Sequence, residues 1–212
     1  MGASPSGADR AFATFLLSAV DPSQFPKPDL PEIAFLGRSN VGKSSLLNAL
    51  VGAKVAFTSG TPGRTRTVSF FDIALGSGKA APVLRLADLP GYGWAKISRS
   101  AAREWPKFVD PYLSERESLC LCVVLVDASV PPQDSDHYMV NRLREAGRRV
   151  VVAATKVDKV PRSKVVTVMN GLKVFLGQSP VPVSSRTDDG VLDLWRQVLG
   201  SAGIAMKGGL KR

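Results

Sequence analysis

The residues best suited to chemistry form a glycine-rich stretch near residue 40. Residues 37–44 read GRSNVGKS and match the pattern G-x-x-x-x-G-K-[ST]. In such a loop backbone N–H groups curl around a phosphate, the lysine reaches phosphate oxygens and the last hydroxyl binds Mg²⁺. A chance loop is the alternative, but an apolar run precedes this one and a helical pattern follows. The pattern predicts a nucleoside triphosphate site at Gly37, Arg38, Ser39, Asn40, Val41, Gly42, Lys43 and Ser44.

A second motif bears on which base is bound. The sequence TKVD at residues 155–158 resembles the [NT]-K-x-D motif of GTPases. A carboxylate at its end accepts hydrogen bonds from guanine N1–H and the 2-amino group, a donor pattern that adenine lacks. An ordinary strand-to-helix cap is the alternative. The motif predicts guanine recognition by Thr155, Lys156, Val157 and Asp158. Val183, Ser184 and Ser185 stand where the GTPases that this motif resembles have a short loop with backbone contacts to guanine O6, and an ordinary turn is the alternative, since serine pairs are common in turns.

A third motif, Asp-x-x-Gly, is typical of loops that sense a terminal phosphate. It comprises Asp88, Leu89, Pro90 and Gly91. We expect Asp88 to hold Mg²⁺ through a water molecule and the Gly91 N–H to contact the γ-phosphate, so that hydrolysis releases the following loop. Upstream, SGTPGRTRT fits a mobile switch whose threonine closes on Mg²⁺. The candidates for that threonine are Thr61, Thr65 and Thr67.

The elements that must position these motifs alternate between strands and helices. Apolar runs predict strands over 32–37, 67–75, 82–90, 119–127, 148–156 and 180–185. Helical patterns occupy 43–52, 134–146, 164–177 and 191–202. Because GSGKAA separates 67–75 from 82–90, these two strands form a predicted hairpin. We expect an α/β fold: a doubly wound, mostly parallel sheet with one antiparallel hairpin strand and ligands at the carboxyl ends of its strands.

The composition fits one domain in a reducing compartment. Of the 212 residues, 44% are apolar and 22% are charged. We expect a partly ordered extension over 1–30, the domain over 31–201 and a basic tail over 202–212. Residues 11–20 predict a short helix that packs on the domain rather than a signal peptide, and no apolar run reaches the ~20 residues that span a bilayer. Cys120 and Cys122 are expected on one strand face as buried residues, because a metal or redox pair lacks partner ligands.

The net charge of +10 is concentrated around the predicted switches. Residues 54–107 contain nine Lys or Arg against three acidic residues, and the tail KGGLKR adds three bases. This clustering favours an RNA or other anionic partner, and a solvated basic face is the alternative.

Together the motifs resemble the EngB-type (YihA/YsxC) bacterial GTPases, which are related to Era and TrmE. The segments PEIAFLGRSNVGKSSLLNAL, TPGRTRTVSFF, DLPGYGWAKIS, TKVDK and PVSS carry this resemblance from about Pro31 to Trp195. It implies a P-loop GTPase domain, with Thr65 as the Mg²⁺-binding switch threonine. The residues implied around the nucleotide there are Gly63, Arg64, Thr65, Arg66 and Thr67. Trp94 and Ser69 depart from the family pattern, and neither is a phosphate-binding position.

The resemblance also implies what the protein does. The family is implicated in assembly of the large ribosomal subunit, and its loss causes a division or septation defect. We therefore expect a cytoplasmic, monomeric GTP switch that uses Mg²⁺, binds rRNA or ribosomal protein and does not insert into membranes. A GTP-dependent signalling or division regulator that never touches RNA is the rival interpretation.

The sequence motifs do not assign a catalytic group. Tyr92 follows Gly91 where Ras-like enzymes have a water-orienting Gln, and a phenol is a poor base at pH 7. We expect Tyr92 to pack and intrinsic turnover to be slow. The resemblance to potassium-activated relatives implies that Asn40 helps to hold K⁺ against the phosphates; an Asn chosen for loop geometry is the alternative. Arg64 and Arg66 are not assigned as catalytic.

Overall fold

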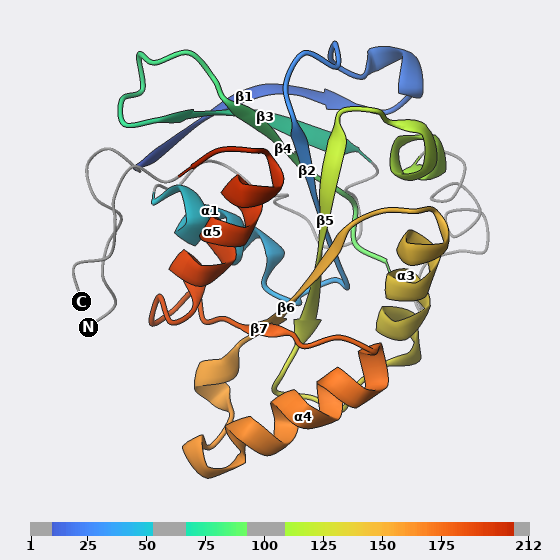
Figure 1. Cartoon of the computed structure of the whole chain (residues 1–212), viewed down its shortest axis with the longest axis vertical. Coiled ribbons are helices and arrows are strands. Elements are labelled where there is room, and N and C mark those ends of the chain that lie inside the picture. Colours follow the sequence, from blue (N-terminus) through green and yellow to red (C-terminus); the bar gives the residue numbers. More distant parts are fainter. Residues whose placement is uncertain (1–9, 53–66, 93–108, 206–212) are drawn as a thin grey trace.

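The computed structural model describes residues 10–52, 67–92 and 109–205, and these contain a seven-stranded sheet (Figure 1). Its strand order is β1-β3-β4-β2-β5-β6-β7. The strands are β1 (Ala11–Ala19), β2 (Glu32–Gly37), β3 (Val68–Leu75), β4 (Leu84–Asp88), β5 (Leu119–Asp127), β6 (Val150–Thr155) and β7 (Val181–Pro182).

Strand direction confirms the expected fold class. The neighbours β4, β2, β5, β6 and β7 pair in parallel. Strand β3 pairs antiparallel with both β4 and β1, so it alone runs against the other described strands. The predicted hairpin over 67–90 is therefore confirmed. Strands β2 and β5 are almost continuously apolar because both of their faces are covered.

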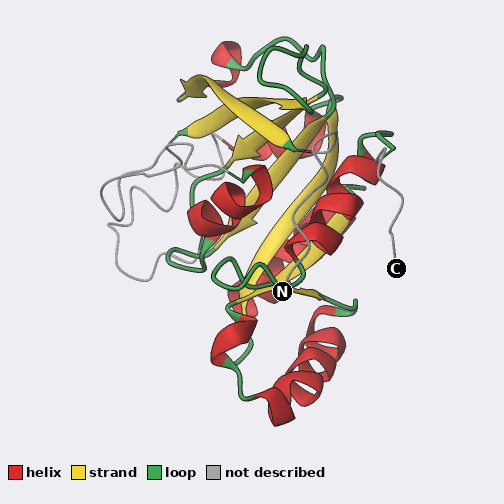
Figure 2. Cartoon of the chain, turned by 90° about the vertical axis from the view of Figure 1, so that its left-hand side faces the viewer, coloured by secondary structure: helices red, strands yellow, loops and turns green. Residues whose placement is uncertain are grey.

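Helices cover both faces of this sheet, as Figure 2 shows. The longer ones are α1 (Lys43–Val51), α3 (Asp134–Glu145), α4 (Val165–Leu176) and α5 (Val191–Ser201), with short 3-10 turns η2 (Pro22–Gln24), η3 (Val157–Lys159) and η4 (Arg162–Lys164). Helices α1 and α5 pack on one core cluster, and α3, α4 and the helical residues 109–115 pack on the other. All four predicted helices are present, whereas the sequence did not predict the helical turn at 109–115.

The helix predicted for residues 11–20 is wrong. Residues 11–19 form the edge strand β1, which pairs with β3 along its length. The Phe15 ring packs edge-on against Phe71 of β3, with ring centroids 5.5 Å apart. A register shift between Phe15 and Leu17 bulges the strand at Leu16. An apolar run this short fits a helix or a strand. Here it is a strand because it pairs with the otherwise free edge of β3.

The two cysteines do not share a face, contrary to the expectation from strand alternation. Where β5 meets β2, the register jumps from Leu119 to Leu121, so Cys120 lies at an irregularity. Cys122 is buried in the cluster beneath α3, whereas Cys120 packs against the cluster beneath α1 and α5. Both thiols are free, and burial raises the pKa of Cys122 to about 12. Neither is prepared for thiolate chemistry.

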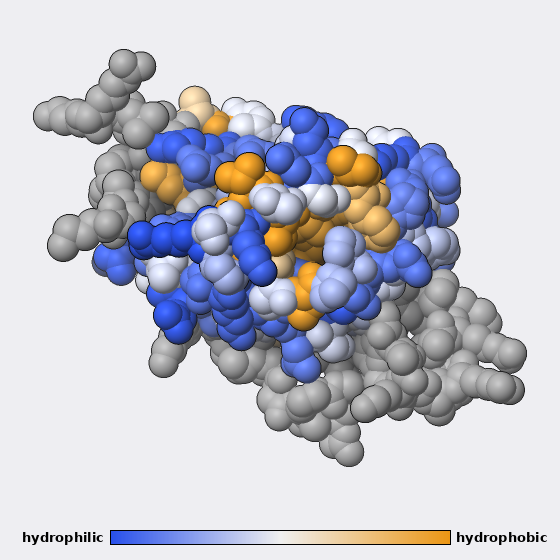
Figure 3. Space-filling model, turned by 90° about the horizontal axis from the view of Figure 1, so that it is seen from below, coloured by the Kyte–Doolittle hydropathy of each residue, from blue (hydrophilic) through white to orange (hydrophobic). Residues whose placement is uncertain are grey.

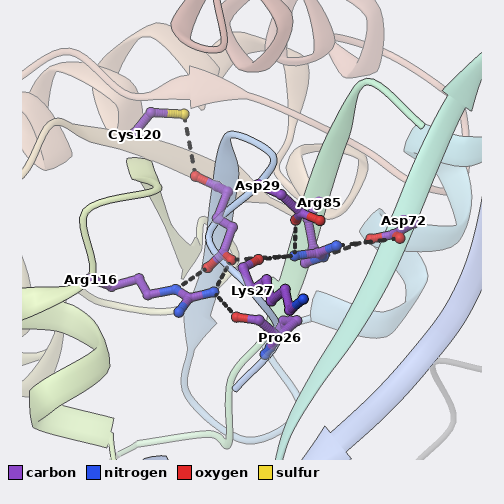
Figure 4. Close-up of polar contacts among 8 residues, drawn as sticks. Pro26, Lys27, Asp29, Asp72, Arg85, Arg116 and Cys120 are labelled. Carbon is purple, nitrogen blue, oxygen red and sulfur yellow. Dashed lines mark hydrogen bonds and ion pairs between the residues drawn. The ribbon is translucent and has the colours of Figure 1, made fainter. Parts of the chain in front are cut away.

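A buried ion-pair network ties the β1–β2 connection to the sheet edge far from the phosphate loop (Figure 4). Glu32, at the start of β2, is fully buried and accepts two hydrogen bonds from Arg116, at 2.5 and 3.1 Å. Arg85 of β4 lies 3.8 Å from Glu32 and donates to Asp72 at 2.6 Å. The two guanidinium groups also donate to the carbonyl oxygens of residues 26 and 27. The network therefore anchors residues 26–29 without any part in the site.

No helix in the described part of the chain has the length and apolarity needed to cross a membrane.

Candidate nucleotide-binding site

The sequence motifs converge at one edge of the sheet. The adjacent parallel strands β4, β2, β5 and β6 end at Asp88, Gly37, Asp127 and Thr155, respectively. Because the carboxyl ends of parallel strands meet at the same edge, three motifs that are spread over more than a hundred residues of sequence become neighbours. This is the edge at which α/β sheets bind ligands.

The phosphate loop connects β2 to α1 in a tight curl. A Cβ on Gly37 would lie 2.7 Å from Val41 Cγ1 and 3.1 Å from Leu125 Cβ, so only glycine fits there. Asn40 and Gly42 both adopt left-handed backbone conformations, with φ of 64° and 102°. Asn tolerates this conformation better than most residues, which gives position 40 a conformational reason for its side chain. Helix α1 begins at Lys43, directly after Gly42.

Lys43 and Asp88 meet inside the site. The Lys43 Nζ contacts Asp88 Oδ1, and both side chains are largely buried. Burial raises the pKa of Asp88, and the Lys43 charge opposes that rise. Ser44 lies next to Lys43 in the first turn of α1. A hydroxyl and a carboxylate are hard oxygen donors that suit Mg²⁺, which keeps several waters and takes few protein ligands. Within the described ranges no cluster of three or more His, Cys, Asp or Glu competes as a metal site.

The Asp-x-x-Gly segment lies against the phosphate loop. Leu89 N–H donates to the Phe35 carbonyl oxygen at 3.1 Å, and Tyr92 N–H donates to the Gly37 carbonyl oxygen at 3.2 Å. A Cβ on Gly91 would lie 3.1 Å from Ser39 Oγ and 3.2 Å from Ser39 N. The glycine thus permits a backbone approach to the loop that a side chain would crowd.

Tyr92 is a packing residue, as the sequence predicted. Its side chain belongs to the core cluster beneath α3 and is only 6% exposed. Its hydroxyl donates to Asp136 Oδ1 at 3.1 Å, and Arg38 Nε donates to both oxygens of the same carboxylate at 3.2 Å. Burial raises the pKa of Tyr92 well above 10, with the nearby Asp136 adding to the rise. A phenol held in this way cannot act as a base near neutral pH.

Thr155 and Lys156 join the base-recognition motif to the phosphate loop. The Lys156 Nζ donates to the Asn40 carbonyl oxygen at 2.7 Å and to Asp127 Oδ2 at 2.6 Å. The Thr155 hydroxyl lies 2.7 Å from the Val41 carbonyl oxygen. Two consecutive residues at the end of β6 therefore fix the loop that would cradle phosphates.

Asp158 lies beside the Val183–Ser185 segment. Ser184 Oγ donates to Asp158 Oδ1 at 2.8 Å, and Val157 N–H donates to the Val183 carbonyl oxygen at 3.3 Å. Ser184 is fully buried, whereas Ser185 is exposed. Arg186 lies 3.4 Å from Asp158 Oδ2, with its side chain 82% exposed. The carboxylate is thereby oriented by a buried serine, and the Asp158 side chain is only 10% exposed.

Several expected residues cannot be placed. Gly63, Arg64, Thr65 and Arg66 lie outside the described residues, as do Thr61 and Trp94. The same holds for Lys96, Arg99 and Arg103, three of the nine bases counted over residues 54–107. Thr67 is described, is partly buried and directly precedes β3. Residues 54–107, which carry most of the excess positive charge, are therefore described only over 67–92.

Three residues that the sequence did not single out help to form the site. Asp127 binds Lys156, Asp136 binds both Arg38 and Tyr92, and Arg186 approaches Asp158. The position of Asp127 at the end of a predicted strand was a usable signal, because strand ends line the ligand edge. Asp136 gave no such signal, since it lies 98 residues from Arg38 within an ordinary helix.

Comparison with known proteins is consistent with this geometry. Residues 32–156 match the model of a family described as "50S ribosome-binding GTPase". A "Probable GTP-binding protein EngB" from Koribacter versatilis is 50% identical over 195 residues, which cover 92% of this chain and 96% of the relative. A protein of the same description from Acidobacterium capsulatum is 45% identical over 192 residues, 89% of this chain and 90% of the relative. The crystal structure of a probable GTP-binding protein engB superposes with a TM-score of 0.64 at 24% identity, covering 81% of this chain and 98% of that one.

Proposed function

The chain belongs to the EngB family of GTP-binding proteins and is a GTPase, and on that premise we propose that it is a slowly hydrolysing switch in large ribosomal subunit assembly. The observation that carries its nucleotide chemistry is the position of Lys156. This side chain holds the phosphate loop at Asn40 while its neighbour Asp158 presents a carboxylate two residues away. One rigid strand end thereby links phosphate binding to base recognition.

The nucleotide-binding residues follow from this arrangement. Backbone N–H groups of the phosphate loop and the positive end of α1 would bind the phosphates, with Lys43 between the β- and γ-phosphates. Asp158 would accept the two guanine donors, and Ser184 keeps its carboxylate in place. We assign nucleotide contact to residues 37–44, 63–67, 88–91, 155–158 and 183–185.

Magnesium fits the oxygen donors of the site. Ser44 and the switch residue Thr65 would bind the ion directly, and Asp88 would bind it through water. When bound, Mg²⁺ neutralises charge that develops on the phosphates. Lys43 pairs with Asp88 in this structure. When the nucleotide and Mg²⁺ bind, Lys43 would turn to the phosphates and Asp88 would serve the ion.

Slow turnover follows from the role of Tyr92. A residue buried against Asp136 supplies neither the donor nor the acceptor with which a glutamine orients water. We propose that K⁺, held in part by Asn40, or a ribosomal group supplies the missing stabilisation of charge. The left-handed backbone of Asn40 supports its role in loop geometry equally well.

The proposed partner is the large ribosomal subunit. The matched family's description names 50S ribosome binding, and the net charge of +10 suits a polyanionic RNA surface. A soluble switch of this kind would act as a cytoplasmic monomer, and the division defect would follow from failed assembly. A GTP-dependent regulator that avoids RNA is the competing proposal, and the same experiment distinguishes it.

The test is GTP hydrolysis in K⁺ and in Na⁺, with and without purified large subunits. We expect subunits to raise the rate and a variant with Lys96, Arg99 and Arg103 changed to Glu to lose that rise. If the subunits change neither the rate of GTP hydrolysis nor the sedimentation of the chain, the RNA-independent regulator is supported. The triple variant must bind GDP as the unchanged chain does, which separates partner loss from site damage.

A further inference from the structure

Helix α4 presents a face of small, polar and two apolar residues to solvent. Only Leu172 and Leu176 of its twelve residues are buried. Val166 and Val174 are 71% and 85% exposed, more than any other large apolar residue that is described. Figure 3 views the molecule from the side of α4 and shows hydrophobic residues gathered among hydrophilic ones. The exposed residues Val166, Thr167, Asn170, Gly171, Lys173 and Val174 recur at three- and four-residue spacing and so share one face.

Gly171 in this face has no reason within the chain to be glycine. It lies inside a helix, where glycine is the least favourable residue apart from proline. A Cβ built at Gly171 would meet nothing within 4 Å, so no neighbour excludes a side chain. Its backbone has no positive φ. Without a side chain at this exposed position, another molecule can approach the helix backbone closely.

The segment that leads into α4 and the helix itself together carry an unbalanced positive charge. Residues 159–177 contain the bases Lys159, Arg162, Lys164 and Lys173 and no acidic residue. All four are exposed, and none forms an ion pair within the described part of the chain. Arg162 and Lys164 precede the first turn, where the helix dipole favours acids. Arg162 and Lys164 therefore gain no stabilisation from the helix dipole, whereas Lys173 in the last turn does.

We propose that the outer face of α4 binds the phosphate backbone of ribosomal RNA. The inference rests on the proposed function and names a second RNA contact, distant in sequence from the basic residues at 96, 99 and 103. Lys164 and Lys173 are nine residues apart, about 14 Å along the helix axis and about two and a half turns, so they flank the exposed face on opposite sides, where each can reach a phosphate. Between them, Gly171 and the short side chains of Thr167 and Asn170 let a sugar-phosphate chain approach the helix backbone.

The chemistry of the face favours RNA over other partners. A membrane-binding helix needs several large apolar or aromatic residues on one side, and this face offers two valines. An acidic protein would satisfy the charges but would give no reason for a bare glycine between them. A second copy of this chain is disfavoured by its own charge of +10.

The first test measures binding to purified large subunits at salt concentrations from 50 to 200 mM. A Lys164→Ala, Lys173→Ala double variant should bind about tenfold more weakly. The negative slope of log K against log salt should become shallower by about 2, because two phosphate contacts are lost. A Lys27→Ala, Lys79→Ala variant is the matched control, because it removes two exposed charges from the β1–β2 and β3–β4 connections, at the opposite end of the molecule from α4 (Figure 1). The control should bind as the unchanged chain does.

The second test separates folding from binding. Gly171→Ala should raise Tm by about 2–4 °C, since alanine favours the helix and its Cβ has room, and yet weaken subunit binding. Gly200→Ala in α5 is the control, because a Cβ there also meets nothing within 4 Å. It should raise Tm similarly and leave binding unchanged.

The outcomes distinguish this inference from the proposed function. If the unchanged chain binds subunits and both α4 variants bind equally well, the inference is wrong and the proposed function stands. Weaker binding with an unaltered salt slope would assign the face to a protein contact and would also overturn the inference. If the unchanged chain does not bind subunits at all, both proposals fail.

Discussion

The Tyr92 hydroxyl donates a hydrogen bond to the Asp136 carboxylate over 3.1 Å, linking the phosphate-sensing segment to helix α3. The same carboxylate receives Arg38 of the phosphate loop. A single buried side chain therefore fixes both segments that would contact the γ-phosphate. In Ras-like enzymes the position of Tyr92 acts on water, whereas here it acts on structure.

Tyr92→Phe should lower the free energy of unfolding by about 1–2 kcal/mol, because one hydrogen bond to a buried carboxylate is lost. GTP hydrolysis should change by less than about threefold, since the hydroxyl has no part in the chemistry. Denaturant unfolding and single-turnover hydrolysis measure the two effects. Tyr138→Phe is the control, because Tyr138 lies on α3 close to Asp136 but is 64% exposed. A hundredfold slower reaction in a fully stable Tyr92→Phe protein would show that Tyr92 does take part in catalysis.

Asp158→Asn should weaken GDP binding by about 10²–10⁴-fold, because two charge-assisted hydrogen bonds to guanine are lost. Xanthosine diphosphate should bind the variant better than GDP does, since its carbonyl at position 2 accepts from an Asn amide. Calorimetric titration with both nucleotides checks this. Arg186→Ala should change GDP affinity little, as that side chain is mostly solvated. Unaltered GDP binding in Asp158→Asn would place guanine recognition elsewhere.

Asp127→Asn should reveal a pH-dependent contribution to stability. Partial burial favours the protonated acid, but hydrogen bonds from Lys156 and Ser129 outweigh it and lower the pKa of Asp127. A carboxyl group whose pKa is lowered in the folded state stabilises the protein at pH values above its unfolded pKa of about 3.9. This stabilisation is lost as the pH falls through the folded pKa. The free energy of unfolding of the unchanged protein should exceed that of the variant by about 1–2 kcal/mol at pH 5–8.

Urea unfolding of both proteins from pH 8 to pH 2.5 measures this difference. The gap should narrow as pH falls below about 3.9 and close once Asp127 is protonated in the folded protein as well. A gap that persists unchanged at the lowest pH would mean that Asp127 contributes through packing and not through its charge.

Asn40→Gly tests the role of potassium without straining the loop, because glycine accepts the left-handed backbone at this position. If Asn40 helps to hold K⁺, the stimulation of hydrolysis by K⁺ over Na⁺ should disappear while GDP affinity stays within about threefold. Hydrolysis rates in the two salts give the readout. Retained stimulation would assign Asn40 to loop geometry alone.

The parallel strands and the four long helices were predictable because their apolar patterns are regular. Strand β5 coincides with the predicted run over 119–127, and α4 differs from its prediction by one residue at each end. These segments are covered by neighbours, so local pattern and tertiary position agree. The phosphate loop was equally predictable, since its glycines serve a geometry that few other residues permit.

Residues 11–19 and Asp136 show where sequence reasoning fails. The run AFATFLLSA has no decisive period, and pairing with β3 determined its conformation. The link from Asp136 to Arg38 and Tyr92 spans 98 and 44 residues and depends on how α3 packs. The prediction that Cys120 shares a strand face with Cys122 was wrong because of one register shift in the pairing of β5 with β2, which moves the Cys120 side chain to the other face.

The measurement that tests the central claim most directly is sedimentation of the chain with large ribosomal subunits in each nucleotide state. With a non-hydrolysable GTP analogue and Mg²⁺, the chain should co-sediment with the subunits, and with GDP most of it should remain in the supernatant. Equal binding in both states would contradict a switch, and binding in neither state would contradict the ribosomal partner.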